Sequence, residues 1–332
     1  MENITLPKLL IYEPAYERLK TALDGRVTPL VLNGEGKVSR AGEIIEANQA
    51  LPEMAWANRD LYKDGPVRDF MVGCLKSSDL RWFQSSAAGF EHPVFGKLIG
   101  NGVRLTNSNA SAVPIAEFVV AQVLSVFHPT EARLAAQREH RWQSLDFRDV
   151  HGSTWFVYGM GHVGTAVAER ARAFGAHVIG CRRTPVGNEP VSEMLSSEAY
   201  LDGVRRADVV VMTASLNQHN KHIVNQAFIE ALRESSVFVN IGRGGLVDEP
   251  VLLAGLDAGC PQWAILDVFD QEPLPDDSPL WDHPKVRLTA HCAGASLGTG
   301  RRGDEIFLEN LGRYLNDEPL LLQVNKSETV DT

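Results

Sequence analysis

The segment from Thr154 to Arg183 restricts the possible folds of this chain more than any other part of it. Its apolar start, Trp155–Tyr158, predicts a buried strand, and His177–Gly180 predicts a second strand after a helix-forming run. Between them lies the spacing G-x-G-x-x-G, formed by Gly159, Gly161 and Gly164. The three glycines allow a tight turn, close approach of a pyrophosphate to the backbone, and close packing of the helix on the strand. We therefore predict a unit that binds a dinucleotide at the helix N-terminus.

Strands and helices continue to alternate on both sides of this segment. From residue 155 onward, at least six short apolar runs predict an α/β fold with a doubly wound parallel sheet of the Rossmann type. Residues 1–104 alternate on a smaller scale and predict a flavodoxin-like α/β substrate domain. We place the dinucleotide-binding domain at 105–295. The substrate domain takes residues 1–104 and 296–332, because an amphipathic helix expected at Arg302–Leu315 lets the chain return to it.

Composition limits the possible partners. The chain has 332 residues, and its formal net charge of −10 leaves no basic footprint for nucleic acid or an anionic membrane. No run approaches 18 consecutive apolar residues and no secretory signal is evident, so we expect a cytoplasmic protein without a membrane span. The four cysteines lack C-x-x-C spacing, and no metal site is expected. His219 and His222, in the run QHNKH, are expected to be solvated.

Three polar residues each follow a predicted strand of the larger sheet: Arg243, Glu272 and His291. The carboxyl ends of parallel strands face the ligand crevice, and these residue types suit the reduction of a 2-oxo acid. An arginine fork binds the carboxylate, a histidine donates a proton to the forming hydroxyl, and a glutamate orients the imidazole. Each also has an ordinary reading, as a surface arginine, a solvated loop carboxylate and a core histidine.

The end of the second strand bears on the choice of dinucleotide. A carboxylate there would accept hydrogen bonds from both ribose hydroxyls of NAD, but this chain has Arg182, Arg183 and Thr184. Two guanidinium groups and a hydroxyl favour a 2′-phosphate, so we predict NADP(H), with NAD(H) possible. The alternative is that both arginines lie on a solvated rim.

Three further segments resemble the D-isomer-specific 2-hydroxyacid dehydrogenases. They are VNIGRGGLVDEPVLLAGL, ILDVFDQEPLPDDSPLW and LTAHCAG, and the resemblance extends over nearly the whole chain. It implies that Arg243, Glu272 and His291 are catalytic, that Arg243 and His291 contact the substrate, and that Asp267 holds the nicotinamide carboxamide. It also implies that a loop after a strand of the first domain donates N–H groups to the substrate carboxylate, although the loop sequence alone is equally compatible with a simple turn. The residues of this loop are Ser86, Ala87, Ala88 and Gly89.

The complete predicted cofactor set combines the glycine turn, the second strand end and two later strand ends. It comprises Gly159, Gly161, His162, Val163, Gly164, Arg182, Arg183, Thr184, Ile241, Gly242 and Asp267. Two departures from the family are visible. Ala290 precedes the histidine where the family usually has proline. Thr213-Ala214-Ser215 follows a strand where a His-x-Pro-like segment is usual, which leaves contacts to the diphosphate and ribose open.

These features predict an oxidoreductase that transfers hydride from NADPH to a small 2-oxo acid, resembling glyoxylate or hydroxypyruvate, and yields the D-2-hydroxy acid. One alternative is a bulkier substrate such as phenylpyruvate, with a pocket lined by Trp56, Trp82 and Phe90, although aromatic residues at such positions are more often part of the core. Another is a non-catalytic protein that senses NAD(P)(H), like the co-repressor branch of the family. The apolar run Ile115–Val126 and the region of Trp142 predict a homodimer.

Overall fold

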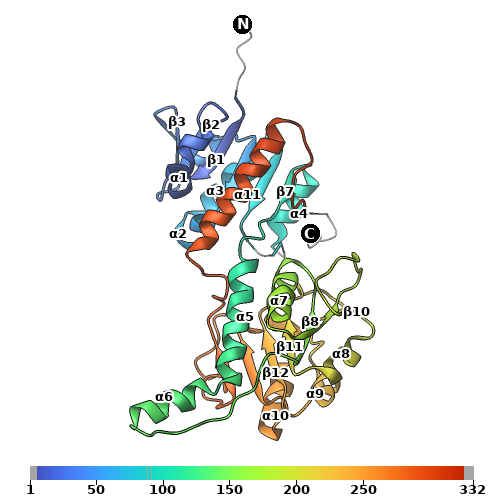
Figure 1. Cartoon of the computed structure of the whole chain (residues 1–332). Coiled ribbons are helices and arrows are strands. Elements are labelled where there is room, and N and C mark those ends of the chain that lie inside the picture. Colours follow the sequence, from blue (N-terminus) through green and yellow to red (C-terminus); the bar gives the residue numbers. More distant parts are fainter. Residues whose placement is uncertain (1–5, 88, 91, 325–332) are drawn as a thin grey trace. The chain divides into compact units, whose positions relative to one another are not determined.

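The computed structural model describes residues 6–87, 89–90 and 92–324, and these form two units, each with its own sheet (Figure 1). Unit 1 comprises Met1–Ser111 and Leu297–Thr332, and unit 2 comprises Ala112–Ser296. The first boundary lies after Ser111 and not after residue 104. The reason is that the strand Arg104–Thr106 pairs within the first sheet, and the next helix begins at Ala112.

The sheet of unit 1 has the strand order β4-β3-β2-β1-β5-β6-β7. Its strands are β1 (Lys8–Tyr12), β2 (Thr28–Leu32), β3 (Lys37–Arg40), β4 (Glu43–Glu46), β5 (Met54–Ala57), β6 (Trp82–Ser85) and β7 (Arg104–Thr106). The strands pair in parallel except for the hairpin β3–β4 and its pairing with β2, which are antiparallel. This hairpin was not predicted. Its strands are short and partly exposed, and its turn lacks the Asn-Gly or Asp-Gly sequence that usually indicates a hairpin. Ala41, in this turn, has a φ of 50°.

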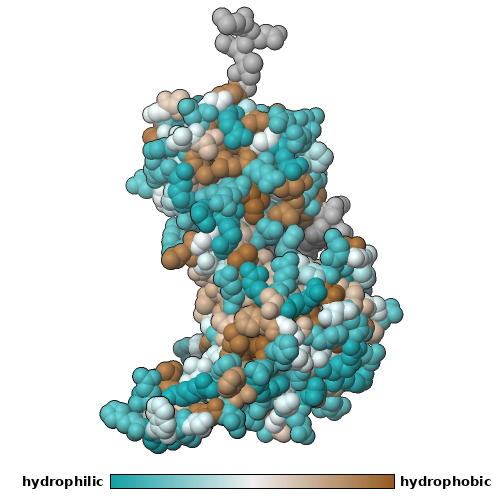
Figure 2. Space-filling view, viewed as in Figure 1, coloured by the Kyte–Doolittle hydropathy of each residue, from teal (hydrophilic) through white to brown (hydrophobic). Residues whose placement is uncertain are grey.

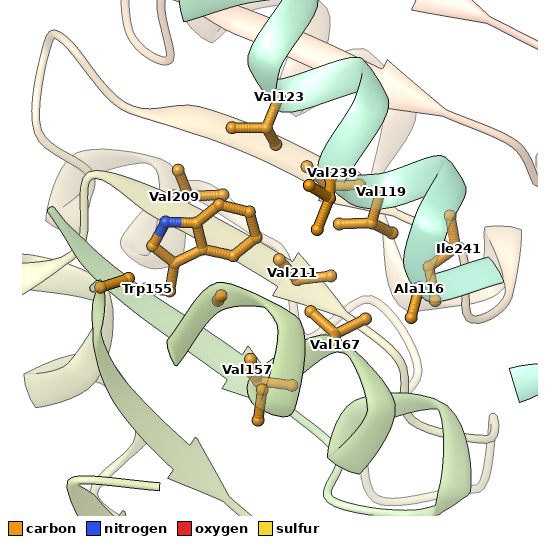
Figure 3. Close-up of a cluster of buried hydrophobic side chains, with 14 of the residues drawn as sticks. Ala116, Val119, Val123, Trp155, Val157, Val167, Val209, Val211, Val239 and Ile241 are labelled. Atoms are coloured by element: carbon orange, nitrogen blue, oxygen red, sulfur yellow. The ribbon is translucent and has the colours of Figure 1, made fainter. Parts of the chain in front are cut away.

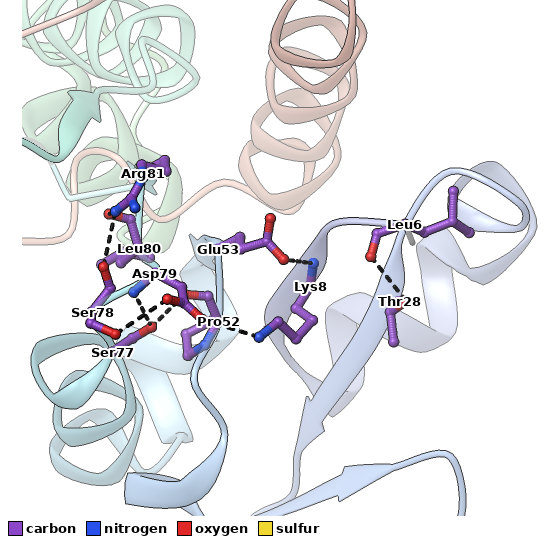
Figure 4. Close-up of polar contacts among 10 residues, drawn as sticks. All are labelled: Leu6, Lys8, Thr28, Pro52, Glu53, Ser77, Ser78, Asp79, Leu80 and Arg81. Atoms are coloured by element: carbon purple, nitrogen blue, oxygen red, sulfur yellow. Dashed lines mark hydrogen bonds and ion pairs between the residues drawn. The ribbon is translucent and has the colours of Figure 1, made fainter. Parts of the chain in front are cut away.

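Polar contacts join the amino ends of the unit 1 strands (Figure 4). The backbone N–H of Lys8 donates to Glu53 Oε1 at 3.3 Å, and Lys8 Nζ lies 3.4 Å from Asp79 Oδ2. Ser77 Oγ donates to the carbonyl of Pro52 at 2.7 Å. Because ligands of open parallel sheets bind at the opposite, carboxyl edge, we assign these contacts a structural role.

The helices of unit 1 are α1 (Glu13–Leu23), α2 (Arg59–Asp64), α3 (Val67–Lys76), α4 (Pro93–Gly100) and α11 (Gly298–Leu315), with a 3₁₀ turn η1 at Ala47–Gln49. Helix α11 returns from the far end of the sequence and lies on this sheet (Figure 1). Its Phe307 stacks on Trp56 and Trp82 at centroid distances of 5.3 and 5.5 Å, and its Asp304 accepts a hydrogen bond from Trp56 Nε1 at 3.1 Å. This packing explains why the chain comes back to unit 1.

The same packing corrects one expectation. Trp56, Trp82 and Phe90 were considered as the lining of a pocket for a bulky substrate, but all three are buried in the core of unit 1. Trp56 and Trp82 lie under α11, and the ring of Phe90 meets that of Phe95 edge to face at 4.9 Å. These aromatic rings are therefore committed to packing.

Unit 2 contains a fully parallel seven-stranded sheet in the order β10-β9-β8-β11-β12-β13-β14. Its strands are β8 (Thr154–Tyr158), β9 (His177–Cys181), β10 (Glu193–Leu195), β11 (Val209–Met212), β12 (Val237–Asn240), β13 (Trp263–Leu266) and β14 (Val286–Leu288). The order runs in one direction from β8 to β10 and in the other from β8 to β14. This reversal confirms the predicted Rossmann-type doubly wound fold, whose ligand crevice opens at the carboxyl ends of the strands beside β8 and β11.

Helices cover both faces of this sheet. They are α5 (Ala112–Phe127), α7 (His162–Ala173), α8 (Tyr200–Arg206), α9 (Gln226–Ala231) and α10 (Glu249–Ala258), with a 3₁₀ turn η2 at Gly244–Leu246. Helix α6 (Thr130–Arg138) follows α5 and projects away from the sheet (Figure 1). Valines of the central strands and Trp155 pack on one face against α5 and α7 (Figure 3). Alternate residues of the same strands pack on the other face against α8, α9 and α10. Such two-sided burial requires strands that are apolar throughout, as they are here.

The apolar helix expected at Ile115–Val126 is confirmed as α5. A polar helix, α6, follows it and ends at Arg138, and Trp142 is fully exposed. In the part of the chain that the structure describes, no single helix has the length and apolarity needed to cross a membrane. Among the described helices, only α5 and α6 taken together, with a 59° bend between them, satisfy that test by length and composition.

Candidate active site

The glycine turn after β8 has the geometry that its spacing requires. Gly159 has a φ of +104°, and a Cβ added to it would lie 2.6 Å from the backbone nitrogen of Ala214. A Cβ on Gly164 would overlap the carbonyl oxygen of Gly159. At Gly161, the N-cap of α7, a Cβ would meet no protein atom within 4 Å. Two of the glycines are thus needed by the protein itself, whereas the middle one faces open space.

This open space belongs to a pocket of about 890 Å³ in unit 2. Four segments line it: the glycine turn, the end of β9 with Arg182, Arg183 and Thr184, the start of α8, and the stretch from Thr213 to Asn225. The free N–H groups at the start of α7 and the two arginines fit the phosphates of a dinucleotide. Partial burial lowers the pKa of His162, the first residue of α7. Val163 is half-buried, on the first turn of the same helix.

The segment after β11, whose departure from the family pattern left its role open, supports the glycine turn. Thr213 Oγ1 donates to the carbonyls of Tyr158, at 3.2 Å, and of Gly159. The backbone of Ala214 fits between two glycines, because a Cβ on Gly242 would lie 2.8 Å from the carbonyl oxygen of Ala214. Small residues are therefore needed where the ends of β8, β11 and β12 meet. Ile241 is buried beside them.

Arg182 is held in place by an acidic partner. Its Nη1 lies 3.4 Å from Glu189 Oε1. Glu189 also accepts hydrogen bonds from the N–H groups of Val186, at 2.7 Å, and Gly187, at 2.8 Å. These N–H groups and Arg182 lower the pKa of Glu189. Arg183 and Thr184 are exposed at the rim of the pocket.

The structure brings His291 and Glu272 into direct contact. His291 Nδ1 lies 2.7 Å from Glu272 Oε2, and the other oxygen, Oε1, accepts a hydrogen bond from the N–H of Phe269 at 3.0 Å. The imidazole is about half exposed, with 53% of the side chain accessible. A carboxylate fixed at one ring nitrogen orients the imidazole and leaves Nε2 as the nitrogen that can face a substrate.

Asp267 holds the loop that carries His291. This carboxylate is 3% exposed, and it accepts hydrogen bonds from Thr289 Oγ1 and from the N–H groups of Cys292 and Ala293, at 2.5 to 3.0 Å. The N–H of His291 donates to the carbonyl of Asp267 at 2.8 Å, and His291 has a φ of 48°. Four hydrogen bonds thus stabilise a left-handed backbone conformation that is otherwise unfavourable for histidine. Apart from an aspartate at the end of a buried strand, no local sequence pattern indicates these hydrogen bonds.

Arg243 lies in a tight turn between β12 and α10. Its carbonyl accepts from Asn240 Nδ2 at 3.0 Å, and its Nη1 donates to the carbonyl of Gly242 at 2.8 Å. A Cβ on Gly244 would overlap the backbone of Phe269, so this turn packs directly on the segment that leads to Glu272. Because β12, β13 and β14 are neighbours, their carboxyl ends carry Arg243, Asp267 with Glu272, and His291 in adjacent positions.

The predicted substrate loop follows β6 in unit 1, and two of its N–H groups are already engaged. The N–H of Ser86 donates to the carbonyl of Ala57 at 2.9 Å, and that of Ala87 donates to Ser85 Oγ at 3.0 Å. That N–H groups of this loop donate to the substrate carboxylate therefore stays a prediction. Gly89 is half-buried, and its assignment stays a prediction. Ala88 lies outside the described residues.

Residues 120–293 match the family model described as "D-isomer specific 2-hydroxyacid dehydrogenase, NAD binding domain". The chain belongs to this family. It is 30% identical over 268 residues to a glyoxylate/hydroxypyruvate reductase, HPR3, of Arabidopsis thaliana, a match that covers 78% of this chain and 80% of the relative. It is 29% identical over 224 residues to D-3-phosphoglycerate dehydrogenase of Methanocaldococcus jannaschii. That match covers 65% of this chain and only 42% of the longer relative.

Solved structures of the family have the same fold. A D-isomer specific 2-hydroxyacid dehydrogenase from Xanthobacter autotrophicus, in complex with NADPH and MES, aligns with a TM-score of 0.76 and 25% identity. An NADPH-dependent glyoxylate/hydroxypyruvate reductase from Sinorhizobium meliloti, in complex with NADP and sulfate, aligns with a TM-score of 0.72 and 25% identity. Both matches cover 97% of this chain and 99% of the other.

The glycine turn generates a matched pair of variants. Gly161→Ala adds a methyl group that meets no protein atom, so we expect the melting temperature to stay within about 1 °C while the affinity for a dinucleotide falls. Gly164→Ala forces a methyl group onto a carbonyl oxygen, so we expect the melting temperature to fall by roughly 5 °C or more. Differential scanning fluorimetry and cofactor titration measure both. Equal melting temperatures for the two variants would contradict this assignment of roles.

Proposed function

We propose that this protein is an NADPH-dependent reductase of small 2-oxo acids, of the glyoxylate or hydroxypyruvate type, which yields the D-2-hydroxy acid. The observation that carries the proposal is the 2.7 Å contact between His291 Nδ1 and Glu272 Oε2 at a strand end next to that of Arg243. A cation for a carboxylate and an oriented proton donor are what the reduction of a 2-oxo acid requires. The name of the Arabidopsis relative points to the same substrate class.

Each of the three residues has a defined task in this proposal. Arg243 binds the carboxylate of the substrate through two parallel hydrogen bonds and polarises the adjacent carbonyl group. When bound, the dihydronicotinamide supplies the hydride. His291 donates its Nε2 proton to the oxygen that becomes the hydroxyl, and Glu272 stabilises and orients the protonated ring from Nδ1. Asp267 keeps the loop of His291 in position, so the imidazole does not have to reorganise during the reaction.

NADP(H) is the proposed cofactor, with NAD(H) as a poorer substitute. The residues at the end of β9 that line the pocket are two arginines and a threonine, and no carboxylate occupies the position that would bind the ribose hydroxyls of NAD. The solved relatives from Xanthobacter autotrophicus and Sinorhizobium meliloti were obtained with NADPH and with NADP. We favour small substrates because the aromatic residues considered for a bulky pocket are buried in the core of unit 1.

His291 and Glu272 can be tested by substitution. We expect His291→Ala to lower kcat with glyoxylate by roughly 10²- to 10⁴-fold, since the proton donor is lost, and to leave the Kd for NADPH unchanged. Glu272→Gln keeps a hydrogen-bonding group but removes the charge, so its loss should be smaller. Cys292→Ala serves as the control, because its exposed thiol has no assigned task. Steady-state kinetics that find His291→Ala nearly as active as the wild type would remove it from this role.

The cofactor and substrate are tested by following NADPH or NADH oxidation at 340 nm with glyoxylate, hydroxypyruvate, pyruvate and phenylpyruvate. We expect kcat/KM to be at least about tenfold higher with NADPH than with NADH, and Arg182→Ala to reduce this ratio by raising the KM for NADPH. We expect the smaller acids to be turned over faster than phenylpyruvate. A higher kcat/KM with NADH would contradict the cofactor assignment. Binding of NADPH without turnover of any acid would favour a dinucleotide-sensing protein instead.

We also propose that the protein is a homodimer that associates through α5 and the segment after it. Hydrophobic side chains gather over α5 on the visible face of unit 2 (Figure 2), and Phe118 lines a pocket of about 370 Å³ there. Beyond α5, Leu134, Trp142 and Phe147 are exposed. Apolar surface of this kind is expected at an interface. Gel filtration with light scattering should give twice the chain mass of 36.5 kDa, and a stable monomer at micromolar concentration would contradict the proposal.

A further inference from the structure

The dinucleotide pocket has a second basic element that the motif-based assignment does not include. Residues 217–222 follow β11 and include the run QHNKH, whose two histidines, His219 and His222, were expected to be solvated. In the structure, His219, Lys221 and His222 line the same pocket as Arg182 and Arg183. Strands β9 and β11 flank β8, so the segments that follow them border the glycine turn from its two sides.

The segment that carries Lys221 is a turn held by hydrogen bonds. Asn220 is 5% exposed, and its side chain closes the turn by accepting from the N–H of Asn217 at 2.7 Å and donating to the carbonyl of Ser215 at 2.8 Å. The N–H of His219 donates to Asn217 Oδ1 at 2.9 Å, and the N–H of His222 donates to the carbonyl of Gly245 at 2.8 Å. A backbone held in this way presents Lys221 from a fixed position, which lowers the entropic cost of binding.

The charges that line the pocket favour an anion. Arg182 shares its charge with Glu189 at 3.4 Å, which weakens it as a partner for a phosphate. Neither Arg183 nor Lys221 forms an ion pair with any residue that the structure describes. Glu198 is the carboxylate among the lining residues, and it is exposed. Three cations against one carboxylate stand out in a chain whose net charge is −10.

We propose that Lys221 is a further specificity-determining residue, which binds the 2′-phosphate of NADP(H) together with Arg182 and Arg183. The inference rests on the proposed use of NADP(H) and goes beyond it, because it assigns part of the discrimination against NAD(H) to the turn after β11. The ammonium group of Lys221 acts as a mobile point charge on a fixed backbone, in the same pocket as the two arginine forks. The ligand class it recognises is a nucleotide with a phosphate on the 2′-oxygen.

The test is calorimetric binding of two probe pairs, NADPH with NADH and 2′,5′-ADP with 5′-ADP, to the full-length protein. We expect Lys221→Ala to weaken NADPH and 2′,5′-ADP by about fivefold or more and to change NADH and 5′-ADP by less than about twofold. Lys221→Arg should retain most of the affinity, and Lys221→Glu should lose more than Lys221→Ala. Lys76→Ala, at an exposed lysine of unit 1, is the control for the change in net charge.

The outcomes separate this inference from the proposed function. A wild type that binds NADH more tightly than NADPH overturns the cofactor assignment itself, whatever Lys221 does. A wild type that prefers NADPH, with a Lys221→Ala variant that weakens both dinucleotides equally or neither, overturns only the role of Lys221. Melting temperatures of all variants within about 2 °C of the wild type exclude a loss of fold as the cause.

Discussion

The hydrogen bonds between Asp267 and the loop after β14 are the constraint on which the proposed catalytic arrangement depends. Three donors converge on one buried carboxylate, and the backbone carbonyl of the same residue takes the N–H of His291. A carboxylate buried to this extent is costly unless its oxygens accept hydrogen bonds, and here the donors belong to the loop that carries His291. The loop and the carboxylate therefore stabilise each other. These hydrogen bonds are needed to hold the left-handed backbone conformation of His291 beside Glu272.

At the other strand ends of unit 2, contacts between neighbouring segments also hold the backbone in place. Thr213 holds the glycine turn, Ala214 fits between Gly159 and Gly242, and the turn of Arg243 packs on the segment that leads to Glu272. Each strand end positions its neighbour, since the sheet brings the carboxyl ends into one row. The side chains proposed to bind cofactor and substrate thus stand on backbone that is fixed by small residues and short hydrogen bonds. Pre-organisation of this kind lets dipoles and charges act without rearrangement.

Local signals predicted the regular part of the fold well. Apolar strands buried on both faces, such as Val209–Met212, and the spacing of Gly159, Gly161 and Gly164 are physical requirements that a sequence displays directly. The antiparallel hairpin β3–β4 was missed because neither its strands nor its turn at Ala41 carries such a signal. The buried positions of Trp56 and Trp82 depend on Phe307, which is more than 200 residues away in the sequence. Long-range packing of this kind leaves no local pattern.

In the candidate site, too, some residues are indicated by local sequence and others depend on the folding of distant segments. Residue types at strand ends indicated Arg243, Glu272 and His291, because the required chemistry narrows the choice to a few side chains. The supporting network could not be predicted in this way. Whether Asp267 faces a ligand or a loop, and whether Lys221 points to solvent or into a pocket, depends on how the connecting segments fold back.

The groups that line the pocket explain how an acidic protein can bind an anionic cofactor. The net charge of −10 opposes a nucleotide phosphate at long range, but such repulsion is screened over about 8 Å at physiological ionic strength. Within that distance, the N–H groups at the start of α7 and the cations at the ends of β9 and β11 dominate the field. Recognition of the dinucleotide is therefore decided by the few groups that line one pocket, and the composition of the chain as a whole says little about it.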